Sequence, residues 1–321
     1  MMKKIAIFGL FCALSLAFAK EPSRPECIAP AQPGGGFDLT CKLVQVSMID
    51  SKVISTPMRV TYMPGGLGVV AYNSMNTNRA KNGNIIVAFS SGTLLNIATG
   101  KHGKYDEKDA RWLASAGVDY GMVAVKADSP YKTLEDLVQA LKKDPQSVSI
   151  GAGGSIGGQD WMQTAMLAKA TGIDVKKVRY VAFEGGGDML TSLLGGHIDV
   201  GSSGIAELLP QIQSGQIRVL AVFAPNRLQG ALANTPTAKE LGYDIEWITV
   251  RGYYMGPKVS DEDYNWWLDA FKKVKQSKEF KEQLSQRGLF EFNKDGAELD
   301  AFVKEQTKKY RALAKEYGII K

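Results

Sequence analysis

A turn of three consecutive glycines joins a strand-like run to a helix-like run near the start of this sequence. Gly34, Gly35 and Gly36 follow the strand-like residues 26–29 (ECIA) and precede the helix-like residues 39–49. Because glycine has no side chain, the N–H groups of such a turn are open to a ligand, and they lie at the positive end of the helix dipole. The turn therefore predicts an anion-binding site.

Asp38 leaves a second interpretation open, because a carboxylate at a helix start can cap the same amides. The recurrence of the pattern is more informative than one turn. Glycine- or serine-rich turns also follow the strand-like runs that end at Phe89, Ile150, Ala182 and Val200. Ligands of open α/β sheets bind outside the carboxyl ends of the strands, so we expect these turns to share one ligand site. Candidate donors in the third and fifth turns are Gly153, Ser155, Ser202 and Ser203.

The first residues have the pattern of a secretory signal peptide. Two lysines precede the apolar residues 5–18, and residues 17–19 (AFA) form a small-x-small cleavage motif. The apolar run is shorter than the ~20 residues of a membrane-spanning helix. We therefore expect residues 1–19 to be cleaved and the protein to be exported to the periplasm, with a retained N-terminal anchor as the alternative.

The charge pattern argues against nucleic acid as a partner. The net charge of +6 becomes +4 when Lys3 and Lys4 are removed with residues 1–19, which contain no acid. Acidic and basic residues are interspersed, and such a mildly positive chain favours an anionic ligand. The sequence has 2 histidines and no Cys/His cluster with zinc spacing, so we expect neither a metal nor a cofactor.

Cys27 and Cys41 flank the triple-glycine turn and are the cysteines that remain after cleavage. An oxidising compartment favours a disulfide between them, which would hold the turn in place. Two buried free thiols are the alternative, since unpaired cysteine is also commonly buried.

Strand-like and helix-like segments alternate over most of the chain, which predicts an α/β fold. About 300 mature residues exceed one comfortable core, so we expect two lobes. We assign residues 20–124 and 252–321 to lobe 1 and residues 125–251 to lobe 2. The tail after residue 260 is helical and charged, and we expect it to pack on lobe 1.

Two catalytic interpretations arise from the loop 151–158. It starts like a dinucleotide fingerprint, but Ile156 stands where a third glycine is needed. Residues 153–157 (GGSIG) also match the G-x-S-x-G motif of serine hydrolases. Asp188 and His197 follow Ser155 in the hydrolase order, but His197 comes only nine residues after Asp188, at a strand entrance. An exported esterase that uses Ser155 is the alternative to a binding protein.

Several other residues have two interpretations. Arg251 can clamp a carboxylate or pair with an acid at the surface. Tyr253, Tyr254, Trp266 and Trp267 can stack on a ligand, but their apolar surroundings favour core packing.

Taken together, the turns resemble those of a known family. The chain resembles the extracytoplasmic solute receptors of tripartite tricarboxylate transporters, the Bug-type receptors, over essentially its whole mature length. The motifs that carry the resemblance are residues 30–38 (PAQPGGGFD), 64–68 (PGGLG), 90–93 (SSGT) and 183–199 (FEGGGDMLTSLLGGHID).

The resemblance implies a type II periplasmic-binding-protein fold, in which two α/β lobes close around a carboxylate. It implies no catalysis, a monomer, and delivery of the ligand to membrane permease subunits. A partnership with a membrane sensor kinase is a further hypothesis. By resemblance, the residues that hold the ligand are Gly34, Gly35, Gly36, Asp38, Ser90, Thr93, Gly185, Gly186, Gly187 and Asp188.

The sequence also departs from the family pattern. Gln32 replaces a common proline, and Asp160 replaces a common histidine. Cys27 and Cys41, together with residues 159–161 (QDW), look more like the branch that binds citrate and related tricarboxylates. The resemblance therefore implies a di- or tricarboxylate ligand.

Overall fold

The computed structural model describes residues 20–321. The predicted signal peptide, residues 1–19, lies outside this part of the chain. Within residues 20–321 no helix is both long and apolar enough to cross a bilayer.

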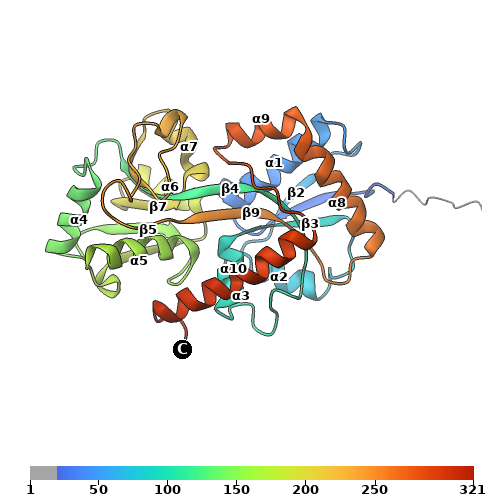
Figure 1. Ribbon diagram of the computed structural model, residues 1–321, viewed down its shortest axis with the longest axis horizontal. Helices are drawn as coiled ribbons and strands as arrows, with labels where there is room; N and C mark the ends of the chain where they lie inside the picture. The colour runs from blue at the N-terminus through green and yellow to red at the C-terminus, as the bar shows by residue number, and fades with distance from the viewer. Residues whose placement is uncertain (1–19) are drawn as a thin grey trace, which may run out of the picture.

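The structure has two α/β lobes, which lie at the two ends of its long axis (Figure 1). This confirms the predicted fold class. The first lobe begins with β1 (Glu26–Ala29), α1 (Gly36–Asp50), β2 (Arg59–Tyr62), α2 (Val69–Asn76), β3 (Ile85–Ser90) and α3 (Ser91–Ala98). In its sheet, β1 lies between β2 and β3 and is parallel to both.

Two strands, β4 (Arg111–Lys126) and β9 (Ile248–Met255), run along the long axis and join the lobes (Figure 1). Residues 111–120 of β4 pair with β9, which also pairs with β3. From Gly121 onward β4 pairs with β7 and β8 of the second lobe. The sheet partners of β4 therefore change at Gly121, close to the predicted lobe boundary, which stays a prediction.

The second lobe consists of α4 (Leu134–Lys143), β5 (Ser149–Gly153), α5 (Gln159–Thr171), β6 (Arg179–Phe183), α6 (Gly186–Leu194), β7 (Val200–Gly204), α7 (Ile205–Gln213) and β8 (Ile217–Val222), with short 3-10 helices at Val175–Lys177 and Gly230–Leu232. Here β5 lies between β6 and β7 and is parallel to both. The carboxyl ends of these strands lead directly into α5, α6 and α7, as the turn pattern predicts.

The chain ends in α8 (Asp261–Gln276), α9 (Lys278–Gln286) and α10 (Ala297–Glu316). Helices α8 and α9 pack on α1, whereas α10 lies against α3 and β4. Trp267, Tyr253 and Tyr254 are buried in the core, in agreement with the packing interpretation.

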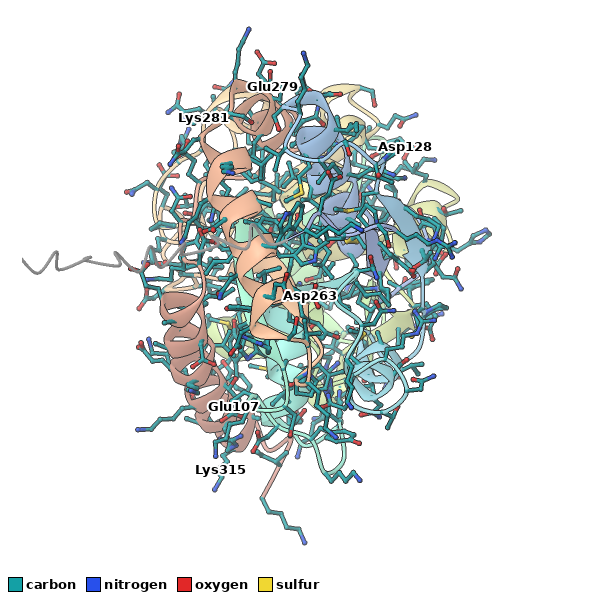
Figure 2. The ribbon with its side chains drawn as sticks, turned by 90° about the vertical axis from the view of Figure 1, so that its right-hand side faces the viewer. Glu107, Asp128, Asp263, Glu279, Lys281 and Lys315 are labelled. Atoms are coloured by element: carbon teal, nitrogen blue, oxygen red, sulfur yellow. A yellow bond between two sulfur atoms is a disulfide. The ribbon has the colours of Figure 1, made fainter. Side chains whose placement is uncertain are left out.

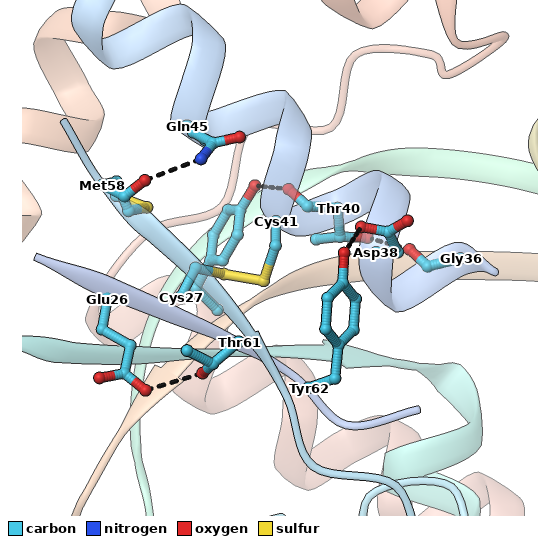
Figure 3. Close-up of a disulfide and its surroundings, with 11 residues drawn as sticks. Glu26, Cys27, Gly36, Asp38, Thr40, Cys41, Gln45, Met58, Thr61 and Tyr62 are labelled. Atoms are coloured by element: carbon cyan, nitrogen blue, oxygen red, sulfur yellow. Dashed lines mark hydrogen bonds between the residues drawn. A yellow bond between two sulfur atoms is a disulfide. The ribbon is translucent and has the colours of Figure 1, made fainter. Parts of the chain in front are cut away.

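A disulfide joins Cys27 of β1 to Cys41 of α1 (Figure 3). It ties the strand before the triple-glycine turn to the helix after it, so the turn is held at both ends. Near it, the Tyr62 hydroxyl donates to Asp38 Oδ1 at 2.9 Å.

The surface carries charges of both signs. The labelled residues of the face in Figure 2 include acidic Glu107, Asp263 and Glu279 as well as basic Lys281 and Lys315. This interspersed pattern agrees with the absence of a basic block in the sequence.

Candidate functional site

A cavity lies between the two lobes, beside the crossing strands β4 and β9. The cavity has a volume of ≈ 40 Å³ for the centres of water molecules. The two lobes therefore leave little free space between them. The residues that line it are Ala31, Gly35, Gly36, Phe37, Leu67, Ser90, Gly92, Gly153, Gln159, Asp160, Gly185, Gly186, Glu207 and Arg251.

Four helices begin at this cavity. Helices α1, α3, α5 and α6 start at Gly36, Ser91, Gln159 and Gly186, and each contributes lining residues from its first turn or its N-cap. A fifth helix, α7, brings Glu207 in its first turn. Within residues 20–321 the first N–H groups of α1, α5 and α6 donate no hydrogen bond, whereas Gly92 N at the start of α3 already donates to Ser90 Oγ and Gln159 Oε1. All four starts present the positive end of a helix dipole, so the arrangement can hold an anion.

Glycine is required at two helix starts because charged side chains approach the backbone there. A Cβ atom on Gly36 would overlap Arg251 Nη1 and lie 2.7 Å from Arg251 Cζ. A Cβ atom on Gly186 would overlap Glu207 Oε2 and lie 3.1 Å from Glu207 Cδ. The glycines thus make room for the protein's own charged groups at the cavity wall.

Arg251 forms a buried ion cluster with two carboxylates. Its Nη2 lies 3.0 Å from Asp119 Oδ2 and 2.9 Å from Glu207 Oε1. The side chains of Arg251, Asp119 and Glu207 are 2%, 0% and 9% exposed, so these pairs are shielded from water. Arg251 is therefore not part of a surface ion pair, and its Nη1 donates no hydrogen bond within residues 20–321.

Asp160 is a third buried carboxyl at the cavity. Its Oδ1 accepts hydrogen bonds from the amides of Gln159 at 3.1 Å and Gln163 at 3.2 Å. Burial away from water and repulsion by Glu207 raise the pKa of Asp160 to about 8. Asp160 is therefore mostly protonated at neutral pH and can donate a hydrogen bond.

Six of the predicted ligand-binding residues line the cavity: Gly35, Gly36, Ser90, Gly153, Gly185 and Gly186. Gly34 and Gly187 lie just behind them. The two glycine turns approach each other closely, since a Cβ atom on Gly187 would lie 3.2 Å from Pro33 O.

Asp38 caps the first glycine turn instead of lining the cavity. Its Oδ2 accepts from Gly34 N at 2.8 Å and pairs with Lys42 Nζ at 2.8 Å. The capping interpretation of Asp38 therefore describes the structure.

The predicted hydroxyl donors have different positions. Ser90 and Thr93 form a capping box at the start of α3. Ser202 Oγ donates to Asp160 O at 3.2 Å. Ser203 Oγ is buried and has no hydrogen-bond partner within residues 20–321, and a Cβ atom on Gly186 would lie 3.5 Å from it.

Ser155 and Asp188 are exposed and do not line the cavity. Ser155 lies at the mouth of the cleft, where its hydroxyl accepts from Lys101 Nζ at 3.1 Å. In the described part of the chain no hydrogen bond joins Ser155 to His197 or Asp188, so the hydrolase triad is not assembled.

No sequence pattern gave a role to Asp119, Gln159, Asp160 or Glu207. The signal that could have found Asp119 is its place between two apolar runs, 112–118 and 122–125, which the structure joins into β4. Gln159 Oε1 accepts from Gly92 N at 2.8 Å, across the cleft, and no local pattern indicates that contact.

Comparisons with known proteins agree with this architecture. The family model described as "Tripartite tricarboxylate transporter family receptor" matches residues 44–319. A Cupriavidus necator protein, "UPF0065 protein in gbd 5'region", is 26% identical over 307 residues, which cover 94% of this chain and 90% of that protein.

Two solved structures share the fold. The periplasmic binding protein BugD has a TM-score of 0.83 at 20% identity, with 93% of this chain and 99% of that chain covered. MatC from Rhodopseudomonas palustris, solved with bound malate, has a TM-score of 0.78 at 18% identity, with 90% and 98% covered. With a family match over most of its length and a two-lobed fold around a cavity, this chain belongs to the receptor family of the tripartite tricarboxylate transporters.

Proposed function

We propose that this protein is a periplasmic receptor that captures a small carboxylate between its lobes and delivers it to the membrane permease of a tripartite tricarboxylate transporter. The convergence of four helix starts on one cavity between the lobes carries the proposal. The free amides at the starts of α1, α5 and α6, together with Arg251 Nη1, are donors that are in place before a carboxylate binds, which lowers the entropic cost of binding. MatC, a structural relative, holds malate.

The mechanism is capture by closure. The open cleft binds the acid, the lobes close by a hinge motion at β4 and β9, and the closed form docks on the permease. No bond of the ligand is changed, so an esterase function for Ser155 is not part of the proposal.

The charges of the residues at the cavity narrow the sequence-based hypothesis of a di- or tricarboxylate ligand. Arg251 is the only cationic residue that lines the cavity among residues 20–321, and it already pairs with Asp119 and Glu207. A citrate-like trianion would therefore meet uncompensated repulsion. We expect small acids of lower charge to bind more tightly than citrate.

A thermal-shift screen of residues 20–321 tests the proposal. The panel contains citrate, isocitrate, tricarballylate, succinate, malate, glutamate, nicotinate and phosphate. A ligand that binds only the folded state adds ~2.7 kcal/mol at a hundredfold excess over its dissociation constant, which is a shift of a few degrees. Stabilisation by carboxylates but not by phosphate supports the proposal, and stabilisation by none of them contradicts it.

Delivery is tested by uptake of the radiolabelled ligand in cells that express the permease. Deletion of the receptor gene should abolish uptake, and the full-length gene should restore it. Uptake that persists without the receptor, with the permease expressed constitutively, would instead favour the sensor hypothesis.

A further inference from the structure

The carboxylate of Glu207 lies between the two glycine turns, at the place where the sequence predicts the carboxylate of the ligand. Its Oε2 is so near Gly186 that no Cβ fits there, and it lies 3.9 Å from the position of a Cβ on Gly35. A residue of the receptor itself therefore supplies a negative charge at this point of the cleft.

Glu207 is held firmly in this position. Its Oε1 accepts from Arg251 Nη2 at 2.9 Å, and the same Nη2 lies 3.0 Å from Asp119 Oδ2. Breaking one partner out of a buried ion pair leaves a charge without compensation, which is strongly unfavourable. An incoming carboxylate is therefore a poor competitor for the place of Glu207.

The second oxygen of Glu207 has no partner. Within residues 20–321, Oε2 accepts no hydrogen bond, although it borders the cavity. The buried Ser203 hydroxyl on the same side also lacks a partner. This side of the cavity thus offers a charged acceptor, with the unpaired Ser203 hydroxyl buried behind it, whereas Arg251 Nη1 and the starts of α1, α5 and α6 offer donors.

From this polarity we propose that the solute is a zwitterion, with a protonated amine on Glu207 Oε2 and a carboxylate on the helix-start amides and Arg251 Nη1. The inference rests on the proposed receptor function and names the ligand class of the same site. An ammonium replaces its lost water by a charge-assisted hydrogen bond to Glu207. A matched acid without the amine leaves that carboxylate unsatisfied, and specificity follows from this difference.

The test compares acids that differ only in one substituent. Three series are titrated by calorimetry into protein freed of ligand by unfolding and refolding: succinate, malate and aspartate; glutarate, 2-hydroxyglutarate and glutamate; propionate, lactate and alanine. In the series whose chain length fits the cavity, we expect the amino acid to bind at least about tenfold more tightly than the unsubstituted acid, a difference of ~1.4 kcal/mol in binding free energy.

The variant Glu207→Gln assigns the preference to one residue. Glutamine keeps an oxygen acceptor for Arg251 and replaces the negatively charged Oε2 by a neutral NH2 group, which is a donor. We expect it to lose the preference for the amine. Glu262→Gln is the matched control, because Glu262 also lies in the first turn of a helix but is exposed on α8. This control should keep the preference, and thermal unfolding shows that both variants are folded.

The outcomes separate this inference from the proposed function. Equal or tighter binding of the unsubstituted or hydroxy acid by the wild type overturns the zwitterion and leaves the receptor function intact. A preference that survives in Glu207→Gln overturns the role of Glu207. Binding of none of the nine acids, nor of any acid in the thermal-shift panel, contradicts the receptor function itself.

Discussion

Arg251 links the site to the stability of the fold, because it compensates Asp119, which is fully buried. We expect Arg251→Met to lower the free energy of unfolding by about 3–5 kcal/mol, since it leaves a buried carboxylate without its cation. Urea denaturation measures the change. Arg227→Met is the control, because Arg227 forms a largely exposed pair with Glu240, and it should cost no more than about 1 kcal/mol.

Adding Asp119→Asn to Arg251→Met should recover part of the loss, because the uncompensated charge is then removed. Equal costs for Arg251→Met and Arg227→Met would show that the buried cluster contributes nothing to stability.

Asp160 makes stability depend on pH. Its pKa is raised from 3.8 to about 8, so the native state holds a proton that the unfolded state releases between these values. The stabilisation from this group is complete below pH 3.8 and is lost as the pH rises through 8. The charged and titratable groups that face Asp160 are Glu207, Arg251, Asp119 and Tyr180.

Asp160→Asn removes this titration. We expect the melting temperature of the variant, relative to the wild type, to rise between pH 5 and 8 and to level off above. Melting curves from pH 5 to 9 measure it. Parallel curves for the two proteins over the whole range would contradict a protonated Asp160 in the native state.

At the residue scale the sequence left Arg251 open between a ligand clamp and a surface ion pair, and it gave Asp119 no role. The two residues are 132 residues apart and meet only through the register of β4 and β9. Glu207 gives no signal in the sequence, because an acid at a helix start resembles an ordinary solvated residue. The charges of the site therefore depend on tertiary contacts that no local pattern encodes.

The elements were more predictable, because each strand–turn–helix unit is local in sequence. The turns after β1, β3, β5, β6 and β7 lie at strand ends as expected, and several helix starts meet at one cavity. Local patterns do not show that Asp38 caps its own turn, since an acid after glycines fits capping and ligand contact equally well.

The disulfide between β1 and α1 supports the most important of these turns. It closes a loop with a sequence separation of 14, and the chain-entropy argument gives such a crosslink roughly 3 kcal/mol. We expect dithiothreitol to lower the melting temperature of residues 20–321 by several degrees and to weaken ligand binding. The variant Cys27→Ala with Cys41→Ala should melt like the reduced wild type and should not respond to the reductant.

A melting temperature that does not change on reduction would mean that other contacts suffice to hold the turn. Asp38 is the candidate, because it bonds Gly34 N, Lys42 and Tyr62 at the same place.

For the whole molecule, length and alternation predicted two lobes, and the structure joins them through β4 and β9. The sequence could not predict the contacts that hold the lobes together. Two such contacts cross the cleft: Gly92 N donates to Gln159 Oε1, and Lys101 Nζ donates to Ser155 Oγ at the mouth. These bonds exist only when the lobes are close, so they favour the closed conformation.

Removing one of them should open the free receptor. Lys101→Met deletes the bond to Ser155 but keeps an apolar stem of similar length. A charge-assisted hydrogen bond contributes about 1.5–3 kcal/mol before exposure to water weakens it, so we expect the closed population to fall several-fold. Small-angle scattering should show a larger radius of gyration for the free variant, which ligand then reduces to the wild-type value.

Affinity supplies the second measurement. If only the closed conformation binds the ligand, the apparent dissociation constant of Lys101→Met rises by the same factor by which the population of the closed conformation falls. Lys104→Met is the matched control, because it removes a neighbouring positive charge that lies over the Tyr105 ring and that forms no hydrogen bond or ion pair across the cleft within residues 20–321. A loss of affinity shared by both variants would assign the effect to long-range attraction of the anionic ligand, whereas a loss in Lys101→Met alone, with the larger free radius, assigns it to closure.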